Sequence, residues 1–202
     1  MTEVIDIIIK GGVVMIPLLA CSLISLALTI ERIIFWTKIK SKQAVQEILR
    51  LVEEGEFEKA LQVGRASRQP IARVLTAGIA HRNPAPAKAM EAAARAEIPV
   101  LKSRLGILDT IITLAPLLGL LGTVVGMIGS FDIMSEAGMG QPHAVTGGVA
   151  EALIATATGL LIAILTLVPY NYFNTRAERE LDEMEHFSSW LELELHEDSG
   201  KP

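Results

Sequence analysis

Three long segments without charge alternate along this chain with segments rich in charged residues. Residues 13–30, 110–131 and 152–175 contain no Asp, Glu, Lys or Arg. A helix needs roughly 20 predominantly apolar residues to cross a hydrocarbon core of about 30 Å. We therefore predict three transmembrane helices, over residues 13–30, 107–131 and 145–170.

The polar segments have the apolar spacing of amphipathic helices. Between the first and second spans, apolar residues recur every three or four positions. The stripes are Ala44, Ile48, Leu51 and Val52, then Phe57, Ala60, Leu61 and Gly64, then Ile71, Val74, Leu75 and Ile79. Pro70 and Pro86 are each expected to open a helix, because proline fits the first helical turn. Leu181, Met184, Phe187, Leu191 and Leu195 have the same spacing, so we predict one long helix from the third span into the tail.

Composition and charge exclude several classes of protein. Half of the 202 residues are hydrophobic and 20% are charged, which excludes a soluble single domain and a disordered chain. The single Cys21 cannot form an intrachain disulfide. It ends a Leu-Leu-Ala-Cys run that resembles a lipoprotein cleavage box, but the apolar run continues to residue 30, which favours an uncleaved helix. A net charge of −5, without basic clusters among aromatics, disfavours nucleic-acid binding.

The basic residues predict the orientation in the membrane. Most of the 18 Lys and Arg lie in residues 31–105, and none lies between 132 and 146. Basic residues near helix ends stay on the cytoplasmic side. The predicted layout, in chain order, is an outer N-terminal segment 1–12, the first span, a cytoplasmic helical domain 31–106, the second span, an outer loop 132–144, the third span and a cytoplasmic helix 171–202.

Small residues mark one face of each helix in the predicted hairpin. The second span has Ala115, Gly119, Gly122, Gly126 and Gly129, and the third has Gly148, Ala152, Ala155, Gly159 and Ala163. Small side chains let membrane helices approach closely. These faces therefore predict tight packing, either within the chain or between copies of it.

Glu151 is the one ionisable residue well inside the hairpin. A charged acid at the bilayer centre costs about 2.5 to 3.5 kcal/mol and usually faces a bundle interior or a water-filled path. Desolvation without a cationic neighbour favours the neutral form of a carboxyl, which suits a group that takes up and releases protons. The alternative is that Glu151 lies near the outer surface and caps its helix.

Threonines could continue a polar path from Glu151. Thr158 lies nearly on the same helical face, whereas Thr156 is turned about 140° away, and Thr123 lies on the second span. A buried threonine commonly bonds a carbonyl of its own helix instead. We expect Asp109 and Glu31 to be interfacial, and the lone His143 of the outer loop to be solvated.

Two segments of the hairpin resemble a known family. APLLGLLGTVVGM at residues 115–127 and GVAEALIATATGL at residues 148–160 resemble the second and third membrane helices of the ExbB/TolQ proton channel family, related more distantly to MotA. The resemblance implies an all-α membrane protein that forms a pentameric ring around a central pore. It identifies Glu151 as the membrane glutamate, and Thr123 and Thr156 as the polar threonines. Thr158 departs from the pattern, since many relatives have an apolar residue there.

The resemblance also implies partners and a location. ExbB-like proteins work in the bacterial inner membrane with a single-span ExbD or TolR-like partner, and pass energy from the proton-motive force to TonB for outer-membrane transport. The N-terminus is then periplasmic and the C-terminus cytoplasmic, with no cofactor or metal. Alternatives are a TolQ-type subunit for outer-membrane integrity or cell division, and a non-conducting scaffold. An intramembrane enzyme is disfavoured, because the hairpin lacks a second acid, a serine-base pair and a metal-ligand cluster.

Overall fold

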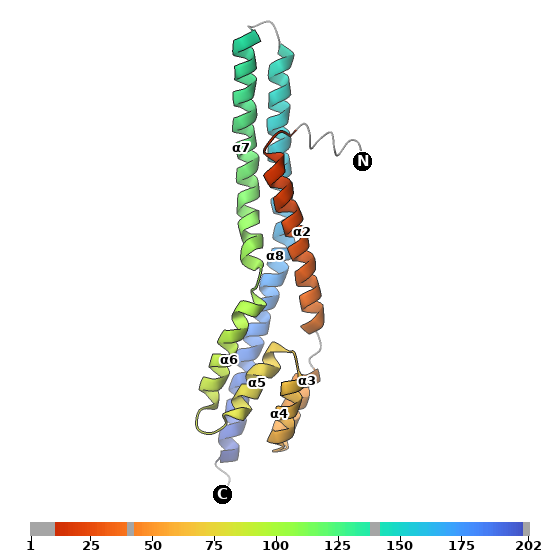
Figure 1. The fold of residues 1–202 in the computed structure, drawn as a ribbon. Coiled ribbons are helices and arrows are strands. Elements are labelled where there is room, and N and C mark those ends of the chain that lie inside the picture. Colours follow the sequence, from red (N-terminus) through yellow and green to blue (C-terminus); the bar gives the residue numbers. More distant parts are fainter. Residues whose placement is uncertain (1–10, 40–42, 138–141, 200–202) are drawn as a thin grey trace. The chain divides into compact units, whose positions relative to one another are not determined.

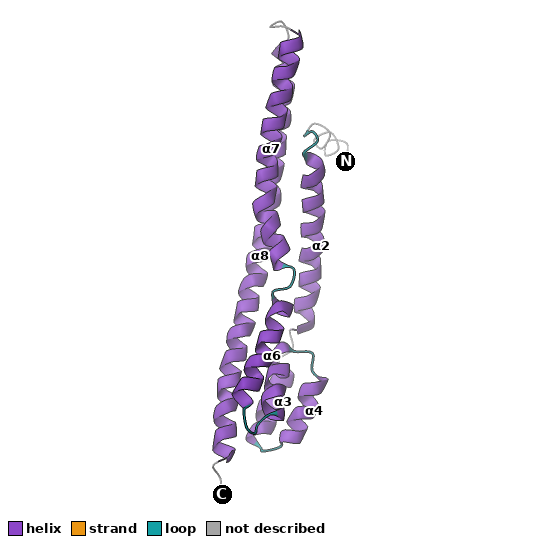
Figure 2. Cartoon of the chain, turned by 60° about the vertical axis from the view of Figure 1, so that its left-hand side comes forward, coloured by secondary structure: helices purple, strands orange, loops and turns teal. Residues whose placement is uncertain are grey.

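Every described element of the computed structural model is an α-helix (Figure 2). The structure describes residues 11–39, 43–137 and 142–199. The helices are α2 (Met15–Ile39), α3 (Gln43–Glu53), α4 (Phe57–Ala66), α5 (Pro70–Ala80), α6 (Pro86–Leu101), α7 (Leu105–Ala137) and α8 (Pro142–Ser199). The predicted all-α fold class is confirmed.

Three helical stretches are long and apolar enough to cross a membrane. They lie within Met15–Glu53, Leu105–Ser135 and Thr146–His196. Their number confirms the three predicted spans. The boundaries of the bilayer along each helix stay a prediction.

The polar segments also form the predicted helices. Pro70 and Pro86 are each the first residue of a helix, where the missing N–H costs nothing because it has no intrahelical partner. The third span and the tail form one helix, α8. α7 continues past residue 131 to Ala137, because no Pro or Gly interrupts that segment. Residues 1–10 and 138–141 of the predicted outer segments lie outside the described residues, as do Lys40, Lys42 and the side chain of His143.

The chain divides into two compact units. The first comprises Met1–Glu31 and Arg104–Tyr172, and the second comprises Arg32–Ser103 and Phe173–Pro202. α2 and α8 each contribute residues to both units.

The first unit packs parts of α2, α7 and α8 around an apolar core. α7 and the first part of α8 lie side by side (Figure 1). The core joins Val14, Met15, Leu18, Cys21, Ile111, Ala115 and Ile162. Many large apolar side chains of the same helices point outward, among them Leu23, Leu117, Leu120, Leu153 and Leu165. An apolar exterior is what a membrane-embedded unit requires, because lipid covers it without cost.

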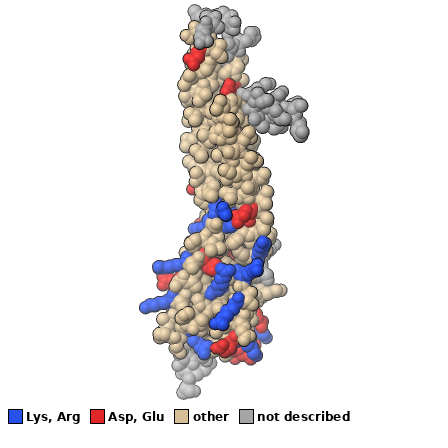
Figure 3. Space-filling view, in the orientation of Figure 1, with Lys and Arg blue, Asp and Glu red and all other residues tan. Residues whose placement is uncertain are grey.

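The second unit packs α3 to α6 with the last part of α8. The four α3 residues Val45, Ile48, Leu51 and Val52 are buried, and a methyl group added at Gly78 of α5 would meet both Met90 of α6 and Leu191 of α8. Charged side chains gather over this unit, whereas the visible face of the first unit is nearly all uncharged (Figure 3).

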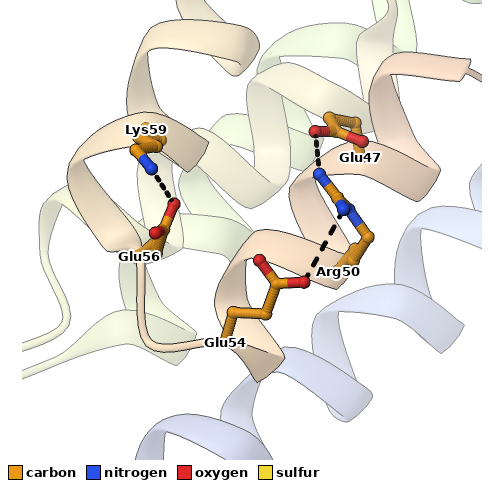
Figure 4. A network of polar contacts seen from close by, with 5 residues as sticks. All are labelled: Glu47, Arg50, Glu54, Glu56 and Lys59. Atoms are coloured by element: carbon orange, nitrogen blue, oxygen red, sulfur yellow. Dashed lines mark hydrogen bonds and ion pairs between the residues drawn. The ribbon is translucent and has the colours of Figure 1, made fainter.

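Ion pairs within the second unit lie mostly on its surface. On α3, Arg50 donates a hydrogen bond to Glu47 at 2.7 Å and lies 3.7 Å from Glu54 (Figure 4). On α6, Arg95 and Glu91 form an ion pair at 2.6 Å. Exposed pairs of this kind contribute about 0 to 1 kcal/mol each, so buried apolar side chains stabilise this unit.

Candidate functional site

Small residues bring the backbones of α7 and α8 into contact. A methyl group added at Gly119 would lie 3.0 Å from Cα of Thr156, and one at Gly126 would lie 2.8 Å from the carbonyl oxygen of Gly148. At Gly159 it would meet the carbonyl oxygen of Ala115. Backbone atoms cannot move aside cheaply, so these positions admit no side chain without separating the helices.

The remaining small residues of the hairpin differ in their surroundings. Gly122 faces the buried Ala155, and Gly148 faces the buried hydroxyl of Ser130. A methyl group at Gly129 would meet no atom of the described chain within 4 Å. Gly129 therefore lies outside the close α7–α8 contact, although its spacing in the sequence places it with the others.

Glu151 lies half-buried on α8, on the hairpin itself. It precedes Ala152, which is buried against α7. Its carboxyl group lies against Gly12, in the segment that leads into α2. Among the described residues, no Lys, Arg or His forms an ion pair with it. The backbone of Gly12, rather than a basic side chain, is therefore the neighbour that the described structure places against this carboxyl group.

The three predicted threonines have different hydrogen-bond partners. Thr156 donates across the hairpin to the carbonyl oxygen of Gly119 at 2.9 Å. Thr158 donates to Ile154 in its own helix at 2.8 Å, and Thr123 donates to Leu120 in its own helix at 2.6 Å. Thr156 is thus the threonine that joins α8 to α7, and none of the three bonds ends on Glu151.

The remaining predicted polar residues lie apart from the hairpin contact. Asp109 is exposed near the start of α7, and Glu31 is half-buried on α2. The described residues contain no group of three or more His, Cys, Asp or Glu side chains that could hold a metal ion.

A second polar contact in the first unit was missed by the sequence reasoning. The hydroxyls of Ser25 on α2 and Thr166 on α8 are buried and lie 2.7 Å apart. They line a small cavity together with Ser22 and Thr29. Ser22, Ser25 and Thr29 recur at helical spacing along one face of α2, and that periodicity was the signal that could have found them.

Comparison with known proteins gives matches over most of the chain. Residues 66–186 match the model of the MotA/TolQ/ExbB proton channel family. The biopolymer transport protein ExbB-like 3 of Synechocystis is 36% identical over 190 residues, covering 91% of this chain and 90% of that relative. The Tol-Pal system protein TolQ of Pseudomonas aeruginosa is 36% identical over 110 residues, covering 54% of this chain and 48% of that relative. The biopolymer transport protein ExbB of Aquifex aeolicus is 40% identical over 81 residues, covering 40% of this chain and 55% of that relative.

The family match includes the hairpin that carries Glu151, and the similarity to the ExbB-like relative of Synechocystis extends over 91% of the chain. Together with the three apolar helices, they make the chain a multi-pass membrane protein. By its sequence, the chain belongs to the MotA/TolQ/ExbB proton channel family.

Proposed function

We propose that this protein is the proton-conducting subunit of an energy-transducing complex in the bacterial inner membrane, and that Glu151 carries the proton. The observation that supports this most directly is the carboxyl group of Glu151 on the small-residue hairpin, without an ion pair among the described residues. A structural acid in a membrane is usually paired, because an unpaired charge there is costly.

The proposed mechanism uses the two states of this carboxyl group. One oxygen of Glu151 accepts a proton from the side of higher proton potential, and the neutral group tolerates an apolar surrounding. Loss of the proton to the other side restores the anion. Thr156 keeps α7 and α8 together beside this step, since its hydroxyl bridges the two helices.

A single chain offers only part of such a pathway. α7 and α8 expose a broad apolar surface, including Leu117, Leu121, Leu160 and Ile164, which suits neighbouring copies and partner helices as well as lipid. We propose a ring of copies, pentameric as the family resemblance implies, around the single helices of an ExbD or TolR-like protein. The partner moves as protons pass, and this movement is the output of the complex.

We favour the ExbB branch, with TonB-dependent outer-membrane transport as the process that receives the energy. The relative that matches over 91% of the chain has a name of the ExbB type. Coverage does not by itself separate the branches, because the TolQ of Pseudomonas aeruginosa matches over 54% of the chain and the ExbB of Aquifex aeolicus over 40%. A TolQ-type role in outer-membrane integrity or cell division is the second candidate, because the family model that matches residues 66–186, the hairpin included, is shared with TolQ. The folded domain of the co-purified partner distinguishes the two branches.

Proton flux into liposomes tests the proposal. The protein and its co-purified single-span partner are reconstituted together, and partner-dependent flux is measured under an imposed membrane potential. We expect Glu151→Gln to reduce flux to the level of protein-free vesicles, because an amide cannot exchange a proton at neutral pH. The control Glu178→Gln changes an exposed acid of the same helix and leaves flux unchanged.

Assembly is measured on the same samples by size-exclusion chromatography. Full flux through an assembled Glu151→Gln complex would overturn the role of Glu151. Absence of flux in the unmodified complex, together with function that does not depend on membrane potential, would favour a non-conducting scaffold.

A further inference from the structure

The segment that leads into α2 lies directly against the carboxyl group of Glu151. Gly11 and Gly12 precede the helix, and Gly12 has a φ of 72°. Residues with a side chain rarely adopt this left-handed conformation, whereas glycine adopts it at no steric cost. The backbone conformation alone therefore favours glycine at position 12.

Space provides a second and independent reason for glycine. A methyl group at Gly12 would overlap Oε1 of Glu151 and lie 2.6 Å from its Cδ and 3.2 Å from its Cγ. The backbone of residue 12 is thus in direct contact with the carboxyl group of Glu151. Any side chain at this position must displace that group.

Gly11 belongs to the same segment and packs against α8 at Ile154, one helical turn beyond Glu151. A methyl group there would lie 3.2 Å from Cγ2 of Ile154 and 2.5 Å from Cγ of Met15. Val14 and Met15, two and three residues after Gly12, are buried in the core of the first unit. The position of Gly12 beside Glu151 is therefore held by packing on both sides of it.

Gly55 has the same backbone conformation as Gly12 but lacks its steric restriction, so the two residues can be compared. It lies in the turn between α3 and α4 with a φ of 73°, nearly the value at Gly12, but a methyl group there would meet nothing within 4 Å. Gly55 needs glycine for conformation alone. Gly12 needs it for conformation and for the carboxyl group that it faces.

We propose that Gly12 is a positioning residue for the proton-carrying carboxyl group. Its backbone blocks movement of the Glu151 side chain toward α2, so that the carboxyl group exchanges protons on its other sides. This inference rests on the proposed role of Glu151 in proton conduction. It adds to the site the segment before α2, which is far from the hairpin in sequence but contacts Glu151.

Substitutions at position 12 test this placement in the reconstituted complex with its partner. Misplacing a reacting group by about 1 Å can cost up to about 100-fold in rate, so we expect Gly12→Ala to lower partner-dependent proton flux about 10- to 100-fold. Gly12→Asn separates the steric effect of a side chain from the effect of backbone strain. Asparagine tolerates positive φ, but its side chain still overlaps the carboxyl group of Glu151. We expect it to lower flux by a similar factor. The control Gly55→Ala imposes the same backbone strain elsewhere and leaves flux within about twofold of the unmodified protein.

Shortening the acid provides a readout that a purely structural role would not change. Glu151→Asp removes one methylene group and makes room for the added methyl group. We expect the double variant Gly12→Ala with Glu151→Asp to conduct more than Gly12→Ala alone, although Glu151→Asp alone conducts less than the unmodified protein. The pH at which flux is half-maximal should also differ between Gly12→Ala and the unmodified protein.

The outcomes distinguish this inference from the proposed function. Unchanged flux in Gly12→Ala and Gly12→Asn, with Glu151→Gln inactive, overturns the positioning role alone. So does a double variant that conducts no better than Gly12→Ala. Full flux in Glu151→Gln overturns the proposed function itself.

Discussion

At the scale of single residues, the two threonines that follow Glu151 serve different contacts. Thr158 is on nearly the same helical face as Glu151, but its hydroxyl bonds the carbonyl of Ile154 in its own helix. Thr156 is turned away from Glu151 and bonds Gly119 of α7. α8 thus presents Glu151 toward the segment before α2 and Thr156 toward α7, because it packs against both.

Replacing each threonine with valine measures this difference, since valine keeps the shape and removes the hydroxyl. Hydrogen bonds between membrane helices contribute about 0.6 kcal/mol on average and up to about 1.7 kcal/mol. We expect Thr156→Val to lower the free energy of unfolding by about this amount and Thr158→Val to change it little. Unfolding of the purified protein in mixed detergent micelles measures both, and equal effects would contradict the assignment of Thr156 as the bridging residue.

At the scale of elements, the close contact of α7 and α8 depends on residues that have almost no side chain. At Gly119, Gly126 and Gly159, the nearest atoms of the opposite helix belong to its backbone. Dispersion between backbones at this distance replaces the hydrophobic effect, which lipid does not supply. The hairpin therefore tolerates no added side chain at these three positions.

Gly126 and Gly129 allow a matched test on one helix. We expect Gly126→Ala to destabilise the protein by about 1 to 3 kcal/mol, the usual cost of overpacking, because its methyl group would press on the backbone of Gly148. Gly129→Ala should be neutral or stabilising by up to about 1 kcal/mol, because alanine favours a helix more than glycine does. Unfolding in detergent again provides the measurement. A larger loss from Gly129→Ala than from Gly126→Ala would contradict the packing described.

At the scale of the whole molecule, apolar and charged surfaces separate between the two units. The first unit exposes large apolar side chains, whereas the second carries most of the charge (Figure 3). The basic residues of the second unit favour the cytoplasmic side for it. The ends of α7 and α8 that adjoin residues 138–141 would then face the periplasm.

Single introduced cysteines test this orientation in intact cells. The native Cys21 is buried on α2 and is first replaced by alanine. We expect Ser135→Cys, near the end of α7, to react with a thiol reagent that does not cross membranes, and Gln62→Cys on α4 to react only after the inner membrane is opened. Both positions are exposed, so reagent access decides the result. Labelling of Gln62→Cys in intact cells would reverse the proposed orientation.

The number of apolar helices, the start of α5 at Pro70 and of α6 at Pro86, and the helical tail were all predictable from the amino-acid sequence. Uncharged length, proline position and apolar spacing act locally along the chain, so they are visible without a structure. The same local patterns singled out Glu151 as the acid inside the hairpin.

Which residues meet across the bundle was visible in the folded structure alone. Helical spacing placed Gly129 with the other small residues, but a methyl group at Gly129 would meet no atom of the described chain within 4 Å. Spacing also gave no sign that Gly12 lies on the carboxyl group of Glu151, or that Ser25 bonds Thr166. Contacts between residues far apart in sequence depend on how the helices cross, and that crossing follows from packing of the whole unit rather than from any one segment.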